Sequence, residues 1–234
     1  MNSAALAHFL QGSKKGLPIV VGYIPIAIAF GVLARQADLP ILPTILMSIL
    51  VYAGASQFMA VNMLVSGTAG LEIVIATFIL NLRHLIMSLS MMNILRHVPK
   101  SWKSLLSFGV TDESFAVASL EASENGSRLH HFFVLGLFTT AYASWIAGTW
   151  AGAVLYQLIP ASISDSMSIA LYAMFIGLLV PAAQKAWRVG LIAAASMILC
   201  TLFNQVFSTG WSVVLATIFG SVAGIFVYEK EEEQ

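Results

Sequence analysis

Residues 73–95 read IVIATFILNLRHLIMSLSMMNIL, an apolar run with Asn81-Leu82-Arg83-His84 at its centre. A helix of this length crosses the hydrocarbon core of a bilayer, and Arg83 then lies near the midplane. A charged side chain facing lipid at that depth costs from about 2.5 kcal/mol to more than 10 kcal/mol. We therefore expect Arg83 to face protein, water or a bound anion, and to have a partner.

The composition places the whole chain in the membrane. Hydrophobic residues make up 59% and charged residues 9% of the 234 residues, and the mean hydropathy is +0.87. A soluble domain carries about a quarter charged residues. We therefore predict an all-α integral membrane protein, since the apolar runs are too long for barrel strands. A net charge of zero and no basic patch argue against nucleic acid as a partner.

Uncharged runs predict about seven membrane helices, with six to eight as the range, in one transport domain over residues 1–234. The runs are 16–34, 43–66, 73–95, 104–120, 132–156, 166–184, 189–207 and 211–228. The first run is interrupted by Gly22-Tyr23-Ile24-Pro25 and the fourth by Thr111-Asp112-Glu113. The N-terminal segment has no cleavage pattern, so we expect it to be retained.

One interpretation of this order is an internal repeat with halves 16–95 and 104–184 and an extra helix pair at 189–228. Interrupted segments at corresponding positions of two halves are typical of a transporter binding site. Basic residues flank the first and fourth runs on both sides. Either both runs cross the membrane fully, or both are broken hairpins that enter and leave by the cytoplasmic face.

Two glycine-containing stretches are candidate breaks in the helices. Pro18 and Pro25 each remove a backbone donor and could free carbonyls for a ligand, although an ordinary proline kink explains them equally well. The stretch Gly54-Ala55-Ser56-Gln57 could break the helix near Gly54, so that amides at a half-helix N-terminus hold a carboxylate. The alternative is that its small residues only allow close helix packing.

The acidic pair Asp112-Glu113 lies inside an apolar segment, next to Thr111. These acids can pair with Arg83, meet an ammonium group or carry a proton, unless the segment is interfacial and both are hydrated. We interpret His84 as a structural hydrogen-bonding residue.

Ser56, His84 and Asp112 together could be drawn as a hydrolytic triad, but nothing in their spacing supports one, so we do not expect an enzyme. No metal-ligand spacing, phosphate loop or dinucleotide fingerprint appears, so we expect no metal and no cofactor. The single cysteine, Cys200, excludes an intrachain disulfide.

Four motifs in sequence order resemble the AzlC family of branched-chain amino acid permeases over about residues 10–230. They are Gly22-x-x-Pro25-x-x-x-x-Phe30-Gly31, Tyr52-Ala53-Gly54-Ala55-Ser56-Gln57-Phe58, Asn81-Leu82-Arg83-His84 and Thr111-Asp112-Glu113-Ser114-Phe115-Ala116. One departure is Ile26, where the family often has Phe. The resemblance implies export of valine, leucine, isoleucine and, by extension, methionine across a bacterial inner membrane. It also implies a small AzlD-type membrane subunit as partner, and leaves open a larger oligomer of such heterodimers.

An amino acid is a zwitterion with an apolar side chain, so its site needs three kinds of surface. We assign the carboxylate to Arg83, Gln57 and the amides near Gly54, and the ammonium to Asp112, helped by Asn81 and carbonyls beside Pro25. The expected apolar pocket consists of Tyr23, Ile26, Phe30, Phe58 and Phe115. The candidate substrate-binding residues are Tyr23, Pro25, Gly54, Ala55, Ser56, Gln57, Asn81, Arg83, His84, Thr111, Asp112 and Glu113. The alternatives are a passive channel for small polar solutes and an accessory membrane subunit without transport of its own.

Overall fold

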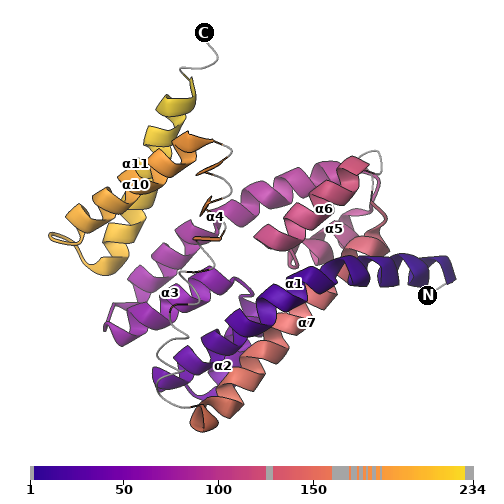
Figure 1. The fold of residues 1–234 in the computed structure, drawn as a ribbon, viewed down its shortest axis with the longest axis horizontal. Helices are drawn as coiled ribbons and strands as arrows, with labels where there is room; N and C mark the ends of the chain where they lie inside the picture. The colour runs from indigo at the N-terminus through magenta and orange to yellow at the C-terminus, as the bar shows by residue number, and fades with distance from the viewer. Residues whose placement is uncertain are drawn as a thin grey trace.

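The computed structural model describes residues 3–124, 129–159, 186–229 and a few positions between 169 and 184. All regular secondary structure in these residues is helical, which confirms the predicted class (Figure 1). The helices are α1 (Ser3–Gln36), α2 (Ile41–Leu50), α3 (Gly54–Val65), α4 (Gly70–Ile94), α5 (Lys100–Ser107), α6 (Asp112–Glu124), α7 (His131–Leu155), η1 (Tyr156–Leu158), α10 (Trp187–Phe203) and α11 (Thr209–Glu229). The predicted run 166–184 falls largely outside the described residues, so the internal repeat stays a prediction.

Three helices in the described part are long and apolar enough to cross a membrane: α1, α4 and α7 with η1. The predicted runs 73–95 and 132–156 correspond to α4 and α7. The shorter apolar helices of the described part are Ile41–Leu50, Trp187–Phe203 and Gly210–Gly224. The chain is therefore a multi-helix membrane protein, as the composition predicts.

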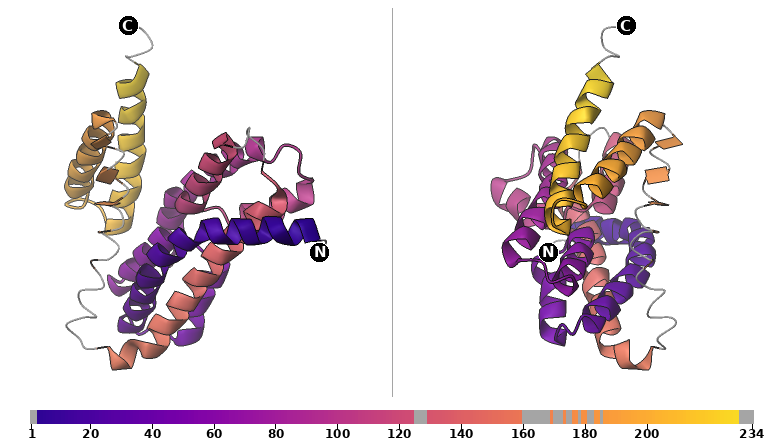
Figure 2. Two further views of the ribbon diagram at one scale, coloured as in Figure 1. Left: turned by 45° about the vertical axis from the view of Figure 1, so that its right-hand side comes forward. Right: turned by 90° about the vertical axis from the view of Figure 1, so that its left-hand side faces the viewer.

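The predicted interruption of the first run is wrong, because α1 continues as one helix through Pro18 and Pro25. The helix is bent along its length (Figure 2), which is the usual effect of a proline inside a helix. Each proline removes one intrahelical hydrogen bond, whereas a full break in an apolar medium would leave several backbone groups without partners. The first run is therefore no hairpin, and Arg35 lies at the opposite end of α1 from Lys15.

Helices α1 and α7 form the central pair of the fold and run in the same direction. A Cβ atom on Gly12 would overlap the carbonyl of Phe133, and one on Gly31 would overlap the carbonyl of Thr149. Glycines on both helices make these contacts, so the two backbones approach closely along most of their length. In lipid, such small-residue packing holds helices together where the hydrophobic effect cannot.

Helices α2 and α3 form a hairpin whose tip, at residues 51–53, lies deep in the fold. The Ser48 hydroxyl of α2 forms a hydrogen bond with the Thr149 hydroxyl, and the Ile49 carbonyl accepts one from the Tyr142 hydroxyl. Helix α2 therefore packs on α7. Helix α3 then runs back to the turn before α4. Tyr52 at the tip has a φ of 46°, a left-handed conformation that a bulky side chain rarely adopts. The predicted break near Gly54 is confirmed.

Helices α5 and α6 form a second hairpin that comes from the other end of the fold. Trp102 on α5 lies 4.9 Å from the His131 ring at the start of α7, and Glu121 on α6 pairs with Lys15 near the start of α1. Between them, the non-helical residues 108–111 reach the middle of α4. The predicted interruption of the fourth run is therefore confirmed, whereas its entry and exit by the cytoplasmic face stay a prediction.

The tips of the two hairpins meet between the long helices. The rings of Tyr52 and Phe108, one from each tip, are 6.4 Å apart. Both rings also contact Tyr142 of α7, at 4.9 Å and 5.7 Å between centroids. We call these three residues the aromatic latch.

Helices α10 and α11 form the predicted C-terminal pair and lie to one side of the other helices (Figure 2). Ser208, before α11, donates a hydrogen bond of 2.5 Å to Glu72 in the first turn of α4. The pair therefore joins the rest of the fold at the start of α4.

Candidate functional site

The site is centred on an ion pair between two elements that are distant in sequence. Arg83 Nη1 on α4 lies 2.9 Å from Asp112 Oδ2 at the start of α6, and about a third of each side chain is exposed (33% and 31%). The sequence predicts that Arg83 has a partner, and pairing with Asp112 is one of the alternatives considered above. The structure selects that alternative.

The start of α6 is fixed by reciprocal bonds between Thr111 and Ser114. The Thr111 amide donates to Ser114 Oγ at 2.8 Å, and the Ser114 amide donates to Thr111 Oγ1 at 3.3 Å. This is the pattern of a capping box, with Ser in place of the usual Glu or Gln. It places Asp112 and Glu113 in the first helical turn, where the helix dipole favours negative charge. The T-x-x-S spacing is therefore a sequence signal for this helix start.

Tyr23 connects α1 to the same helix start. Its hydroxyl donates to Glu113 Oε2 at 2.6 Å and lies 2.7 Å from Thr111 Oγ1. The sequence assigns Tyr23 to an apolar pocket, but the structure uses its hydroxyl as a polar group. Glu113 is thereby held beside the ion pair.

A cavity of about 30 Å³ lies between the two hairpin tips and helices α1, α4 and α7. That volume is far below the roughly 300–1,000 Å³ of pockets that enclose small organic ligands. The predicted site residues that line it are Tyr23, Gly54, Ala55, Arg83, His84, Thr111, Asp112 and Glu113. The other lining residues are Tyr52, Ala53 and Trp145, which the sequence-based assignment misses.

Four predicted site residues do not line this cavity. Gln57 is buried, donates to Ser48 Oγ at 3.0 Å and accepts from Trp145 Nε1 at 3.1 Å, so its polar atoms bind other helices. Ser56 donates to Asn81 Oδ1 at 2.6 Å, which joins α3 to α4. Pro25 is exposed and lies within continuous helix. In this structure Gln57 and Pro25 therefore do not reach the cavity, and their predicted roles stay predictions.

Most of the residues predicted to form the apolar pocket also lie away from the cavity. Phe30 and Phe58 are fully buried against each other, with ring centroids 5.4 Å apart. Ile26 and Phe115 pack on the same hydrophobic core. These side chains stabilise the helix packing, and only Tyr23 of that set reaches the cavity.

Two buried polar atoms of the cavity lining have no hydrogen-bond partner: Arg83 Nε and the Tyr52 hydroxyl. Buried polar groups in native proteins are rarely left unpaired. Tyr52 belongs to the motif 52–58 quoted above, so the sequence placed it beside the predicted break. Its left-handed backbone, which brings it to the cavity, could be seen only in the structure. Trp145 gives no such signal, because an aromatic residue in an apolar run is ordinary.

The start of α3 is the second half-helix N-terminus at the cavity. Its N-cap residue, Ala53, makes no side-chain cap. The first amides of α3, at Gly54 and Ala55, have no intrahelical acceptor, and these residues line the cavity. Uncapped amides at a helix N-terminus are suited to binding an anion. Among the described residues, no group of three or more His, Cys, Asp or Glu side chains is arranged to hold a metal ion.

The family model described as "AzlC protein" matches residues 18–159. Inner membrane protein YgaZ of Escherichia coli is 31% identical over 93% of this chain and 88% of its own. Branched-chain amino acid transport protein AzlC of Bacillus subtilis is 26% identical over 73% of this chain and 66% of its own. An uncharacterized membrane protein of Archaeoglobus fulgidus is 33% identical over 75% and 76%. No solved structure matches the chain.

Proposed function

The chain belongs to the AzlC family, and from this premise we propose that it exports branched-chain amino acids by alternating access. The substrates are valine, leucine, isoleucine and, by extension, methionine. The protein works in a bacterial inner membrane with a small AzlD-type subunit, carries no cofactor and is not an enzyme. The transport role named for the Bacillus subtilis relative supports the substrate class.

One observation carries this proposal: opposite charges and unpaired polar atoms line the cavity between the two hairpin tips. Arg83 and Asp112 supply the charges, and Arg83 Nε and the Tyr52 hydroxyl remain without partners. A zwitterion needs a cation and an anion a few ångströms apart, and discontinuous helices at the membrane midplane are the usual way to build such a site. The alternative of a purely structural ion pair leaves both unpaired atoms unexplained.

The substrate carboxylate binds Arg83 and the uncapped start of α3. A guanidinium presents donors in a planar fork that matches a carboxylate. The amides of Gly54 and Ala55 and the Tyr52 hydroxyl add donors from the facing tip. Gln57, engaged elsewhere, takes no part.

The substrate ammonium binds Asp112 and Glu113. When Arg83 turns to the substrate carboxylate, Asp112 loses its ion-pair partner and becomes available to the ammonium. Glu113, held by Tyr23, adds a second carboxylate on the same side. The substrate thus replaces the Arg83–Asp112 contact with two contacts of its own.

The cavity beside Arg83, at about 30 Å³, is much smaller than an amino acid needs, so the hairpin tips separate when the substrate binds. In this proposal the structure is a form of the carrier with a contracted site, in which about a third of the Arg83 and Asp112 side chains is still exposed (33% and 31%). A site that must enlarge to take its substrate is expected of a carrier that works by alternating access, whereas an open channel needs no such change.

Transport of labelled leucine tests the proposal. The chain and its small partner are reconstituted together in vesicles preloaded with unlabelled leucine, with empty vesicles as the control. A carrier shows saturation and counterflow of label. Linear flux without counterflow would indicate a channel, and no binding or movement of any amino acid would indicate an accessory subunit.

A further inference from the structure

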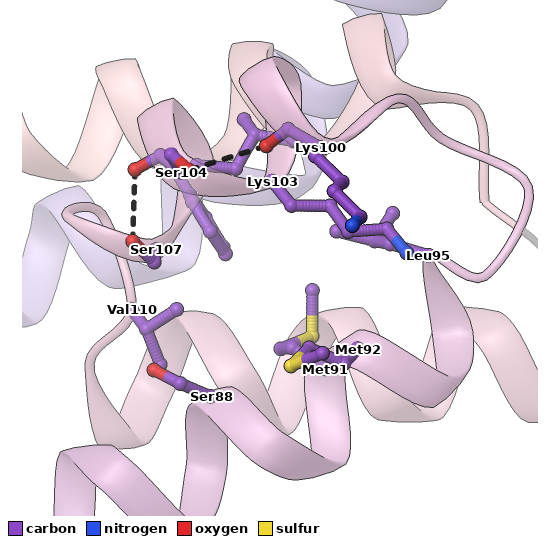
Figure 3. Close-up of a pocket in the computed structure, with 11 residues that line it drawn as sticks. Ser88, Met91, Met92, Leu95, Lys100, Lys103, Ser104, Ser107 and Val110 are labelled. Carbon is purple, nitrogen blue, oxygen red and sulfur yellow. Dashed lines mark hydrogen bonds between the residues drawn. The ribbon is translucent and has the colours of Figure 1, made fainter.

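A second cavity, of about 390 Å³, lies between the C-terminal half of α4 and helix α5 (Figure 3). Met91, Leu95 and Leu106 form part of its wall and are at most 3% exposed. Phe138 of α7 and Val110 complete the apolar lining. Its volume is within the range of cavities that hold small organic molecules.

This cavity adjoins the central one along the chain. Ser88 in its wall lies one helical turn along α4 from His84, on the same face. Val110 in its wall directly precedes Thr111. His84 and Thr111 both line the central cavity. The linings of the two cavities are therefore neighbours along α4 and along the turn before α6.

The second cavity lies at the end of the fold where cationic side chains gather. Arg96, Lys100 and Lys103 surround the turn between α4 and α5, and α1 brings Lys15 to the same end through its pair with Glu121. Basic residues concentrate on the cytoplasmic side of inner-membrane proteins. An exported molecule approaches from that side.

The polar groups of the cavity suit a zwitterion. Lys100 and Lys103 extend along one edge, opposite Met91 and Met92 (Figure 3). No acidic side chain is paired with either lysine in the described part of the chain. The Ser104 and Ser107 hydroxyls donate to the carbonyls of Lys100 and Ser104, at 3.2 Å and 2.8 Å, so their oxygens remain free to accept.

We propose that the cavity between α4 and α5 is a loading site, where a branched-chain amino acid binds from the cytoplasm before it reaches Arg83. Lys100 and Lys103 bind the carboxylate, the serine oxygens accept from the ammonium, and the apolar wall takes the side chain. This inference rests on the proposed function and adds to it a second binding site. Because the wall is apolar, glycine binds there poorly.

The test measures occupancy of the cavity directly. In a Cys200→Ser background, a single cysteine replaces Ser104, which is exposed at the cavity. Ser101→Cys is the matched control, because Ser101 is exposed on the same helix and does not line the cavity. The complete two-subunit complex is labelled with a charged maleimide in vesicles of phosphatidylcholine.

Leucine at ten times its dissociation constant should slow labelling at Ser104→Cys about tenfold, because the unoccupied fraction falls to about a tenth. The same concentration of glycine should have little effect, and labelling at Ser101→Cys should not change. The double variant Lys100→Gln, Lys103→Gln should raise the leucine concentration needed for half protection by about fivefold.

Unchanged labelling in saturating leucine would overturn the loading site. So would protection by added phosphatidylglycerol without protection by leucine, which would mean that the cavity holds an anionic lipid. Wild-type transport is measured in the same vesicles. If leucine is transported but does not protect, the loading site alone fails; if leucine is not transported, the proposed function fails whatever the labelling shows.

Discussion

Arg83 is the residue whose surroundings matter most, since it is charged, central and only partly satisfied. One of its nitrogens contacts Asp112, and its Nε is buried without a partner. The side chain therefore has hydrogen-bonding capacity that the protein itself does not use. A ligand carboxylate would use it, and the geometry of the guanidinium then matters as much as its charge.

Arg83→Lys should reduce leucine efflux about tenfold or more, although the charge is kept, because an ammonium cannot bind a carboxylate and Asp112 through a planar fork. Arg96→Lys is the control, since Arg96 is exposed, its side chain donates to Asn93, and its carbonyl, which accepts from Lys103, is kept in the variant. Efflux is measured at equal amounts of protein in the membrane. Wild-type efflux from Arg83→Lys would exclude Arg83 from substrate binding.

Asp112→Asn should abolish efflux, because the neutral amide attracts neither Arg83 nor the substrate ammonium. The matched control is Asp38→Asn, at a position with a φ of 57°, where Asn is tolerated as well as Asp. Initial rates from preloaded cells provide the measurement. A fully active Asp112→Asn protein would show that the carboxylate is only a helix-start residue.

For single residues, the sequence predicts the partners of the charged side chains well and those of the neutral polar side chains poorly. Arg83 and Asp112 stand out because charge is costly in lipid, so the position alone demands a partner. The bonds of Gln57 were not foreseen because its partners, Ser48 and Trp145, come from other elements. A neutral amide in an apolar run can satisfy itself in many ways, and only tertiary packing selects one.

The two hairpins are the elements that make a site possible. Both α3 and α6 begin at the central cavity, so the positive ends of two helix dipoles face the same space. Acidic residues occupy the start of α6, whereas the start of α3 has no side-chain cap. One tip thus suits a cation and the other an anion.

The close contact of α1 and α7 predicts that the same change, Gly to Ala, destabilises the protein at one glycine of α1 and has no effect at another. Gly31→Ala should destabilise the protein by about 1–3 kcal/mol, because the added Cβ overlaps the Thr149 carbonyl. Gly22→Ala should not, since nothing lies within 4 Å of its Cβ position. Thermal unfolding in detergent measures both. Equal unfolding temperatures for the two variants would contradict the packing described here.

The start of α7 predicts a dependence of stability on pH. His130 accepts a hydrogen bond from the Phe132 amide, at 3.3 Å through Nδ1. Burial, followed by the charges of His131, His8 and His97, lowers the pKa of His130 below its usual value of 6.5. The folded state therefore favours neutral His130, so this contribution is complete above pH 6.5 and is lost as the pH falls below it.

His130→Asn should make the unfolding temperature less sensitive to acid, because Asn caps a helix without titrating near neutral pH. Unfolding is followed between about pH 8 and pH 5, with the wild-type chain in parallel. Parallel curves for the two proteins would show that His130 does not set the dependence.

Element prediction succeeds where local chemistry decides and fails where packing does. The break before Gly54 and the break at Thr111 follow from small or polar residues inside apolar runs, and both are present. Pro25 carries the same kind of signal, yet α1 continues through it. The difference is that α1 packs along α7 over most of its length, so an intact helix buries more surface than a broken one.

The whole molecule has two hairpins that enter from opposite ends and meet at the aromatic latch of Tyr52, Phe108 and Tyr142. With the latch closed, the cavity beside Arg83 is too small for an amino acid, while the cavity behind α5 has room for one. Transport therefore requires a tip to move against α7. Charge alone could not tell the two forms apart, because basic residues flank both the first run, which is one continuous helix, and the fourth run, which is a hairpin.

Joining Phe108 to Tyr142 should stop transport, because the bond fixes the tip of the α5–α6 hairpin on α7. Their rings are 5.7 Å apart and neither residue lines the central cavity. Cysteines replace both in a Cys200→Ser background and are bridged by a short cleavable reagent. The control bridges Phe203 and Phe219, which join α10 to α11 at 5.8 Å. Leucine efflux should fall only in the first pair and return on cleavage; full efflux with the first pair bridged would mean that this tip does not move.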